Sequence, residues 1–305
     1  MKVFVTGVAG QLGHDVMNEL AGRGLEGIGS DLAEQYSGMQ DGTAVTQMPY
    51  VPMDITDPDC VREVIEKAAP DAVIHCAAWT AVDMAEDDDK VEKVRLINGK
   101  GTEYIAQICK KLDIPMMYIS TDYVFDGQGT EAWKPDCKDY KPMNVYGQTK
   151  LEGELAVSSL LEKYFIVRIA WVFGVNGKNF IKTMLNIGKT HDTLRVVNDQ
   201  IGTPTYTYDL ARLLVDMIQT DKYGYYHATN EGGYISWYDF ACEIFKKAGY
   251  DHVTVLPVST QEYGISKAVR PFNSRLDKSK LTENGFELLP TWQDALERYL
   301  KLIEY

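Results

Sequence analysis

Hydrophobic and polar positions along the first half of the chain alternate between short apolar runs and longer amphipathic stretches. Apolar runs predict strands, whereas apolar residues spaced three or four positions apart predict helices. The runs at 71–77 and 116–120 are typical of strands buried on both faces of a sheet. The resulting strand–helix rhythm predicts an α/β fold with a doubly wound parallel sheet. Strands are expected at 3–5, 25–30, 50–53, 71–77, 116–120 and 165–171, and helices at 10–23, 61–68, 91–112 and 145–162.

Beyond about residue 175 the alternation of strand and helix patterns becomes less regular. Shorter strands are expected at 194–197, 225–228 and 253–258, and helices at 207–218, 237–248 and 292–303. This change predicts a larger domain over 1–175 and a smaller lobe over 176–305, interleaved because the sheet can take strands from both halves. The polar stretches 32–49 and 128–142 lack a clear period and are expected to be loops.

Charge and composition narrow the class of partner. The 31 basic and 44 acidic residues give a net charge of −13, which repels phosphate backbones and argues against nucleic acid. There is no apolar stretch long enough to span a membrane, and the N-terminus runs directly into a strand pattern, so we expect a cytoplasmic chain. The five cysteines are scattered without a CxxC pair, which predicts neither a disulfide framework nor a zinc site.

A glycine-rich turn lies between the first expected strand and helix. Gly7, Gly10 and Gly13 have the spacing GxxGxxG, which lets backbone N–H groups and a helix N-terminus approach a pyrophosphate. Asp31 ends the second strand, close to the spacing expected for a carboxylate that holds a ribose hydroxyl. The same carboxylate repels a 2′-phosphate. The turn therefore predicts a dinucleotide site over 1–175 that favours NAD(H), with NADP(H) left open.

A second candidate centre begins the helix after the fifth strand. Tyr146 and Lys150 are four residues apart and so share one helical face. A nearby ammonium stabilises a phenolate and lowers the pKa of the tyrosine, which suits proton transfer. Thr121 ends the fifth strand at the same edge of the sheet, where ligands of open α/β folds bind. Together these residues predict an acid–base centre for a carbonyl or an alcohol.

Several blocks carry a resemblance to a known family. The glycine turn, the Cys-Ala-Ala strand end, Thr121 and the YxxxK pair resemble the extended short-chain dehydrogenases/reductases. More specific blocks are similar to the dTDP-4-dehydrorhamnose reductase family, from the first strand to the last helix. These blocks are CAAWTAVD from Cys76, STDYVFDG from Ser120, VYGQTKLEG from Val145, RIAWVFG from Arg168, DQIGTPT from Asp199 and RPFNS from Arg270.

The resemblance implies an enzyme that reduces the C4 keto group of a dTDP-linked 6-deoxy-4-keto sugar by hydride transfer from NAD(P)H. It implies that Tyr146 donates the proton and that Thr121 binds the carbonyl oxygen. It also implies that Lys150 adjusts the pKa of Tyr146 and holds the nicotinamide ribose. The remaining implied cofactor contacts are Gly7, Gly10, Gln11, Leu12, Gly13, Asp31, Asp54, Ile55, Ala77, Ala78 and Thr80. The implied substrate contacts in the lobe and at its border are Thr121, Asp122, Tyr123, Trp171, Asn179, Phe180, Gln200 and Arg270.

Plainer interpretations stand beside these roles. Trp171 can pack under the rim of the sheet, Arg270 can form a surface salt bridge, and Thr121 can bond its own backbone. The acidic run 86–89 is better explained as a solvated helix start than as a metal site, and the five histidines are dispersed. We expect no metal, and a homodimer is left open.

Two rival functions remain. An epimerase or dehydratase of the same fold is one, although the string Thr121-Asp122-Tyr123 lacks the Asp-Glu pair that dehydrating relatives use. A non-catalytic regulatory subunit is the other, because a subunit of methionine adenosyltransferase resembles this same family. The intact Thr121, Tyr146 and Lys150 favour an enzyme.

Overall fold

The central feature of the fold is a seven-stranded sheet in which every neighbouring pair is parallel. The computed structural model describes all 305 residues. The strand order β11-β6-β5-β4-β1-β2-β3 reverses at β1 and β4, as in doubly wound dinucleotide folds. The predicted fold class is confirmed. The strands are β1 (Lys2–Thr6), β2 (Glu26–Asp31), β3 (Tyr50–Pro52), β4 (Ala72–His75), β5 (Met116–Thr121), β6 (Tyr164–Ile169) and β11 (Gly224–His227).

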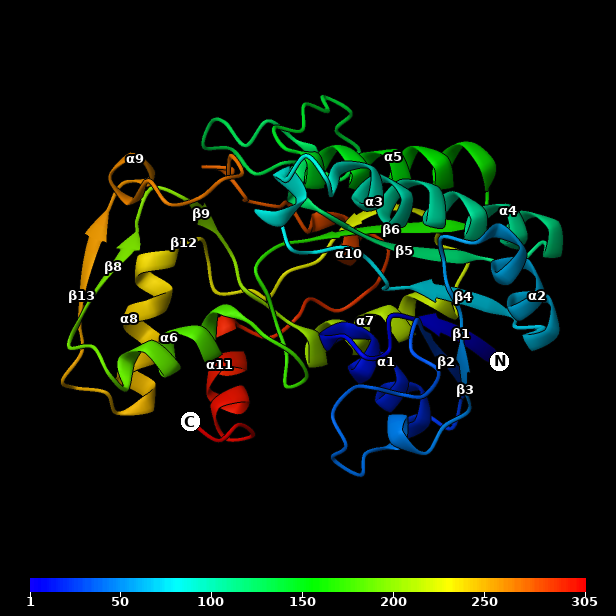
Figure 1. The fold of residues 1–305 in the computed structure, drawn as a ribbon, viewed down its shortest axis with the longest axis horizontal. Coiled ribbons are helices and arrows are strands. Elements are labelled where there is room, and N and C mark those ends of the chain that lie inside the picture. Colours follow the sequence, from blue (N-terminus) through cyan, green and yellow to red (C-terminus); the bar gives the residue numbers. More distant parts are fainter.

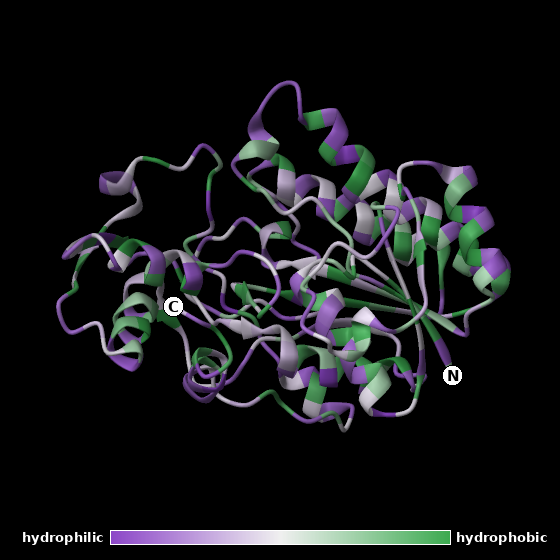
Figure 2. Ribbon diagram, turned by 60° about the horizontal axis from the view of Figure 1, so that its bottom comes forward, coloured by the Kyte–Doolittle hydropathy of each residue, from purple (hydrophilic) through white to green (hydrophobic).

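Helices cover both faces of this sheet (Figure 1). One apolar cluster joins the strands to α1 (Gln11–Gly22) and α7 (Thr207–Ile218). A second cluster joins the other face to α2 (Pro58–Ala68), α4 (Thr102–Leu112) and α5 (Val145–Leu160). The strands are largely apolar, whereas the covering helices carry polar residues on their outer sides (Figure 2). This distribution explains why the strands read as continuous apolar runs and the helices as amphipathic ones.

The second half of the chain builds a lobe beside the sheet (Figure 1). A third apolar cluster forms its core, and three two-stranded sheets lie outside the central one. Its helices are α6 (Phe180–Gly188), α8 (Trp237–Ala248), α9 (Thr260–Tyr263) and α11 (Trp292–Leu300), whereas α10 (Ser279–Glu283) packs beside β11 of the central sheet. Its strands pair as β7 (Val172–Phe173) with β10 (Thr205–Tyr206), β9 (Ile201–Gly202) with β12 (Ile235–Ser236), and β8 (Thr193–Val197) with β13 (Thr254–Val258).

The two halves exchange elements. The strand β11 of the second half pairs with β6, and α7 packs on the same face of the sheet as α1. The predicted division at residue 175 stays a prediction, because these elements cross it.

The helix expected over 91–112 is interrupted. It consists of α3 (Val91–Arg95), a π-helical stretch over Leu96–Gly101 and then α4. A single π-turn inside an α-helix leaves too weak a signal in the sequence to be predicted from apolar spacing. Short 3-10 turns complete the chain at η1 (Ala44–Thr46), η2 (Met84–Glu86) and η4 (Asp122–Val124).

Candidate active site

A cleft of about 860 Å³ follows the carboxyl ends of the central strands and reaches the lobe. Its position matches the place where ligands bind in open α/β sheets. All the predicted site residues line it except Asn179 and Gln200. Those that line it are Gly7, Gly10, Gln11, Leu12, Gly13, Asp31, Asp54, Ile55, Ala77, Ala78, Thr80, Thr121, Asp122, Tyr123, Tyr146, Lys150, Trp171, Phe180 and Arg270.

The glycine turn forms one end of the cleft. Gly7 has a φ of 72°, and a Cβ there would lie 2.6 Å from the backbone nitrogen of Ala77. A Cβ at Gly13 would collide with the carbonyl oxygen of Gly7. Gly10 caps α1 without a side-chain hydrogen bond, which leaves the first N–H groups of the helix for an anion. These features fit the pyrophosphate of a dinucleotide.

Asp31, at the end of β2, lies beside the glycine turn and fixes its conformation. Its carboxylate accepts hydrogen bonds from the backbone N–H groups of Ala9, at 3.0 Å, and Leu32, at 2.8 Å. The acid therefore fastens the glycine turn to the end of β2 while lining the cleft. Each carboxylate oxygen can accept a further hydrogen bond, so a ribose hydroxyl can still bind there.

The helix α5 positions the Tyr146–Lys150 pair. Asn144 caps α5, because its side-chain oxygen accepts a hydrogen bond from the backbone N–H of Gly147 at 2.8 Å. Its amide nitrogen donates to the carbonyl oxygen of Val269, also at 2.8 Å. The start of the helix is thus fixed from two directions, and Tyr146 lies in its first turn.

Lys150 is buried, and its ammonium has two close neighbours. Nζ donates to the carbonyl oxygen of Ile119 at 2.7 Å and lies 4.1 Å from the centre of the Tyr118 ring. Burial lowers the pKa of Lys150 to about 7, although the charge of Glu154 opposes the shift. The ammonium therefore titrates near neutral pH.

The electrostatics of Tyr146 differ from the sequence expectation. Burial raises the pKa of Tyr146 above its ordinary value, and the hydroxyl of Thr121 only partly opposes this. The ammonium of Lys150 is turned to the carbonyl oxygen of Ile119. The ring of Tyr146 meets that of Tyr123 edge-on, with centroids 5.4 Å apart. A phenol that keeps its proton suits the donor in a reduction.

Thr121 and Asp122 lie beside Tyr146 at the end of β5. The hydroxyl oxygen of Thr121 accepts a hydrogen bond from the backbone N–H of Tyr123 at 3.2 Å. The same hydroxyl lies 3.1 Å from Oδ1 of Asp122, which is 2% exposed. Burial raises the pKa of Asp122 to about 6.

Arg270 spans the cleft from the lobe. Its guanidinium donates to Asp83 at 2.7 Å and to the hydroxyl of Tyr123 at 3.2 Å. Arg270 thus lines the cleft and also forms an ion pair, so the two interpretations offered for it are compatible.

Aromatic rings form the wall of the cleft on the side of the lobe. Trp171 has a φ of 51°, a conformation that a tryptophan rarely adopts and that the fold must enforce. Its ring stacks on Trp237, with centroids 3.8 Å apart, and Phe180 lies 4.6 Å from Trp237. Trp237 was not predicted to belong to the site. In the sequence it is only the first apolar residue of a helix.

Asn179 and Gln200 lie outside the lining of the cleft. Asn179 caps α6, and its amide nitrogen donates to Gln11, Gly174 and Tyr299. Gln200 donates to the hydroxyl of Thr260 at 3.0 Å. The substrate contacts expected of both residues stay predictions; in this structure Asn179 joins the lobe to Gln11 of α1, and Gln200 joins two segments of the lobe.

Asn98 is a buried residue near the site that the sequence did not indicate. It lies in the π-helical stretch, and its side chain bonds both backbone groups of Trp79, at 2.8 and 3.2 Å. Its amide also donates to the hydroxyl of Thr149 on α5. Asn98 therefore ties the loop after β4 to the helix that carries Tyr146.

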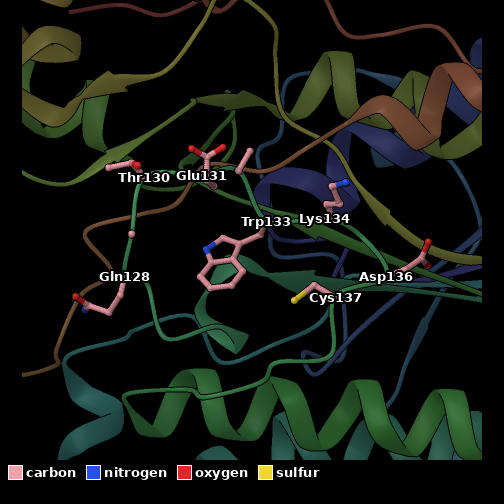
Figure 3. Close-up of a pocket in the computed structure, with 9 residues that line it drawn as sticks. Gln128, Thr130, Glu131, Trp133, Lys134, Asp136 and Cys137 are labelled. Carbon is pink, nitrogen blue, oxygen red and sulfur yellow. The ribbon is translucent and has the colours of Figure 1, made fainter.

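A second hollow, of about 520 Å³, is formed by nine residues of a single loop, 128–137 without Pro135 (Figure 3). The loop folds around Trp133, whose ring stacks on Phe125 at 4.5 Å. This hollow shares no residue with the larger cleft. It contains no paired acid and base, so it is not the candidate site.

Two kinds of feature are absent from the structure. No helix is long and apolar enough to cross a membrane. No group of three or more histidine, cysteine, aspartate or glutamate side chains comes together as a metal site would require.

The parallel sheet, the glycine turn and the tyrosine–lysine pair in the cleft together define a dinucleotide-dependent oxidoreductase. More specifically, the chain belongs to the family described as "RmlD substrate binding domain", whose model matches residues 1–304. The spore coat polysaccharide biosynthesis protein SpsK of Bacillus subtilis is 37% identical over 300 residues, covering 98% of this chain and 97% of that protein.

Solved structures agree with this assignment. A dTDP-4-dehydrorhamnose reductase of Clostridium acetobutylicum is 40% identical, with a TM-score of 0.88 and 99% of each chain covered. The dTDP-4-dehydrorhamnose reductase of Bacillus anthracis, solved in complex with NADP, is 37% identical, with the same TM-score and coverage.

Proposed function

We propose that this chain reduces the C4 keto group of a dTDP-linked 6-deoxy-4-keto sugar, converting dTDP-4-dehydrorhamnose to dTDP-rhamnose with NAD(P)H. The observation that carries the proposal is that Tyr146, Thr121 and Lys150 line one cleft together with the glycine turn. Curated relatives at 34–37% identity are named dTDP-4-dehydrorhamnose reductase and cover nearly the full chain.

The residues that would hold the dinucleotide are those that the family resemblance implies, and all of them line the cleft. The glycine turn and the N-terminus of α1 would bind the pyrophosphate, and Asp31 would bind the adenine ribose. Asp54 and Ile55 would meet the adenine. Ala77, Ala78 and Thr80 would line the nicotinamide side. When bound, the nicotinamide supplies the hydride that reduces the sugar carbonyl.

Side chains of the protein supply the proton and bind the sugar oxygen that receives it. Tyr146 donates its phenolic proton to the oxygen at C4, and the hydroxyl of Thr121 binds the same oxygen. Developing negative charge on that oxygen is stabilised because both donors are held in place before reaction. Lys150, one helical turn from Tyr146, supplies positive charge and a ribose contact.

The substrate would occupy the part of the cleft that the lobe completes. Tyr123 and Trp171 offer flat faces for the pyranose ring. Phe180 lies beyond them and would contact the nucleotide. Arg270 would give the diphosphate a bidentate partner if its guanidinium turned from Asp83.

We favour NADH over NADPH because Asp31 places a carboxylate where a 2′-phosphate would lie. Lys93 and Lys178 also line the cleft. The proposed partner is the nucleotide sugar and not nucleic acid, in line with the net charge of −13. We place the reaction in the cytoplasm, where such substrates and cofactors would be met.

The test is a direct assay with dTDP-4-dehydrorhamnose and either nicotinamide cofactor. We expect loss of absorbance at about 340 nm, which reports oxidation of the reduced nicotinamide, together with formation of dTDP-rhamnose. Purification with stoichiometric, tightly held NAD⁺ and no net reduction would indicate an epimerase instead. Absence of turnover with intact cofactor binding would indicate a regulatory subunit.

A further inference from the structure

The glycine turn is held by a side chain of the lobe as well as by the sheet. Asn176 lies in the loop between β7 and α6, is 6% exposed and does not line the cleft. Its amide nitrogen donates to the carbonyl oxygens of Ala9, at 2.9 Å, and Gly10, at 3.2 Å. Its side-chain oxygen accepts a hydrogen bond from the backbone N–H of Met39 at 3.2 Å. Both polar atoms of this buried side chain are therefore bonded.

These bonds determine how the peptide groups of the turn are oriented. The N–H of Ala9 is bound by Asp31 and its carbonyl oxygen by Asn176, so this residue is fixed on both sides. The carbonyl oxygen of Gly10 is also directed to Asn176. In a planar trans peptide the N–H and C=O point in opposite directions, so the N–H of Gln11 is turned away from Asn176. That N–H is the first of α1 and is one of those left for a pyrophosphate.

A second contact between the lobe and the turn lies beside the first. The side-chain oxygen of Gln11 accepts hydrogen bonds from the backbone N–H of Gly174, at 2.8 Å, and from the amide of Asn179, at 3.1 Å. Gly174 and Asn179 lie on either side of Asn176 in the chain. The loop over residues 174–179 therefore bonds three consecutive residues of the glycine turn.

The same loop is continuous with the part of the cleft proposed for the nucleotide sugar. Trp171 precedes the loop, Phe180 follows it and Lys178 belongs to it, and all three line the cleft. A ligand that contacts these side chains holds the loop in the position in which Asn176 bonds the glycine turn. The loop is thus a physical connection between the two parts of the cleft.

The long excursion over residues 32–49 orients the amide of Asn176. The excursion is fixed on α1, because the backbone N–H of Val45 donates to the side-chain oxygen of Asn18 at 2.8 Å. From this position the N–H of Met39 binds the oxygen of Asn176. The oxygen is thereby kept away from the glycine turn, and the two amide hydrogens are left for the carbonyl groups of the turn.

We propose that Asn176 is a positioning residue through which a nucleotide bound at the lobe stabilises the glycine turn for the dinucleotide. The proposal rests on the proposed function, which places the nucleotide sugar at the lobe and NAD(P)H at the turn. In the free protein the contact of Asn176 with the turn opens and closes, and a ligand at the lobe keeps it closed. Asn176 touches neither ligand. Coupling between two sites is reciprocal, so each ligand raises the affinity for the other by the same factor.

The two hydrogen bonds from Asn176 to the turn set the size of the effect. Two such bonds are enough for about a 50-fold change in the affinity for the dinucleotide. About tenfold of this change is already present in the free protein, because the contact is formed for part of the time. The remaining factor of about five appears when a ligand holds the lobe.

The experiment measures binding and requires no turnover. Titration calorimetry gives the Kd of NADH alone and at saturating dTDP, the nucleotide part of the proposed substrate. In the wild type we expect dTDP to lower the Kd of NADH about fivefold. In Asn176→Ala the Kd of NADH alone should rise about tenfold, and dTDP should no longer change it. The Kd of dTDP alone should stay within about twofold of the wild-type value, because the substrate part of the cleft is intact.

Two further variants separate the hydrogen bonds from packing and from general stability. Asn176→Asp keeps the size of the side chain and the bond from Met39, but it replaces the two donors by an oxygen. We expect it to lose the effect of dTDP as Asn176→Ala does. Repulsion between the new carboxylate and a pyrophosphate does not affect this ratio, since it acts with and without dTDP. Asn284→Ala is the control, because its amide also donates to a backbone carbonyl at 2.9 Å, that of Lys280, away from the cleft. It should keep the wild-type ratio.

Two results would overturn the proposal. One is a Kd of NADH in the wild type that dTDP leaves unchanged. The other is a wild-type ratio in Asn176→Ala or Asn176→Asp, which would assign Asn176 a purely structural role. If Asn176→Ala does not fold, Asn176→Asp decides alone. Coupled binding of both ligands without reduction of the keto sugar would contradict the proposed function and support the coupling, whereas a protein that binds no dTDP would contradict both.

Discussion

The ammonium of Lys150 lies 2.7 Å from the carbonyl oxygen of Ile119 in β5, and both residues line the cleft. The ring of Tyr118 closes its other side. A lysine in this position is poorly hydrated, so its charge is costly to the folded state although the site requires it. Stability and activity are therefore expected to oppose one another here.

Replacing Lys150 with methionine should separate these two effects. The folded-state pKa of Lys150 is lowered to about 7, so the unfolded chain binds more protons between pH 7 and the ordinary value near 10.5. Wild-type stability should consequently rise across that pH range. In Lys150→Met this rise should be missing, the Tm at pH 7 should be higher and turnover should be lost. A lower Tm in the variant at pH 7 would contradict the burial argument.

Tyr146→Phe removes the proposed proton donor and leaves the ring in place. We expect kcat to fall by about 10²- to 10⁴-fold, the usual contribution of a general acid. Binding of NADH, followed by its fluorescence, should change little. Tyr208→Phe provides a matched control, because Tyr208 is 47% exposed and lies outside the cleft. A Tyr146→Phe enzyme that keeps most of its turnover would refute the assignment.

Asp31→Asn tests the choice of cofactor more sharply than removal of the side chain. The asparagine oxygen can keep the hydrogen bond from Ala9, whereas the negative charge is lost. We expect wild type to bind NADH more tightly than NADPH, and the substitution to narrow the difference. Asp31→Ala should narrow it as well but also loosen the glycine turn. Equal affinities in the wild type, measured by calorimetry, would contradict the role given to Asp31.

The pair Arg168–Glu154 is fully buried beneath α5 and connected by two hydrogen bonds of 2.8 Å. Arg168→Met alone leaves the carboxylate unpaired in the core and should lower the free energy of unfolding by about 3–5 kcal/mol. The double variant Arg168→Met, Glu154→Leu should recover much of this loss. Urea denaturation of both proteins provides the measurement, and an equally unstable double variant would argue against an electrostatic cause.

His14 connects α1 to the long excursion over residues 32–49 through Asp41, at 3.1 Å. Burial lowers the pKa of His14, but Asp15 and Asp41 outweigh it and the net pKa is raised. The stabilisation is therefore complete below the unfolded pKa near 6.5 and is lost as the pH rises through the higher folded value. We expect faster amide exchange in residues 39–46 at pH 8 than at pH 6, after correction for intrinsic rates. Asp41→Asn should remove the difference.

The period of the apolar residues was enough to predict the sheet, its covering helices and the position of the cleft. Local strings also indicated Tyr146, Lys150 and Thr121, because the chemistry of the pair and the end of a strand are both visible in sequence. The structure added contacts between distant segments. The ammonium of Lys150 faces Ile119, and Asn144 reaches Val269, which no local pattern encodes.

Residues whose sequence context suggests ordinary packing were harder to place. Trp237 lines the cleft and stacks on Trp171, a contact between segments far apart in the sequence. Asn98 lies in a π-helical stretch where the sequence predicts one continuous helix. Asn179 caps α6 in this structure, and its expected contact with the substrate stays a prediction.

The pairing of β11 with β6 has a consequence for synthesis on the ribosome. Residues 224–227 complete the edge of the sheet, so a nascent chain that has emerged only as far as β6 exposes an unpaired strand with apolar neighbours. Such an edge is a template for association with other chains. The central sheet therefore cannot be completed until the second half of the chain has been made. A fragment ending near residue 175 should need a chaperone to stay in solution.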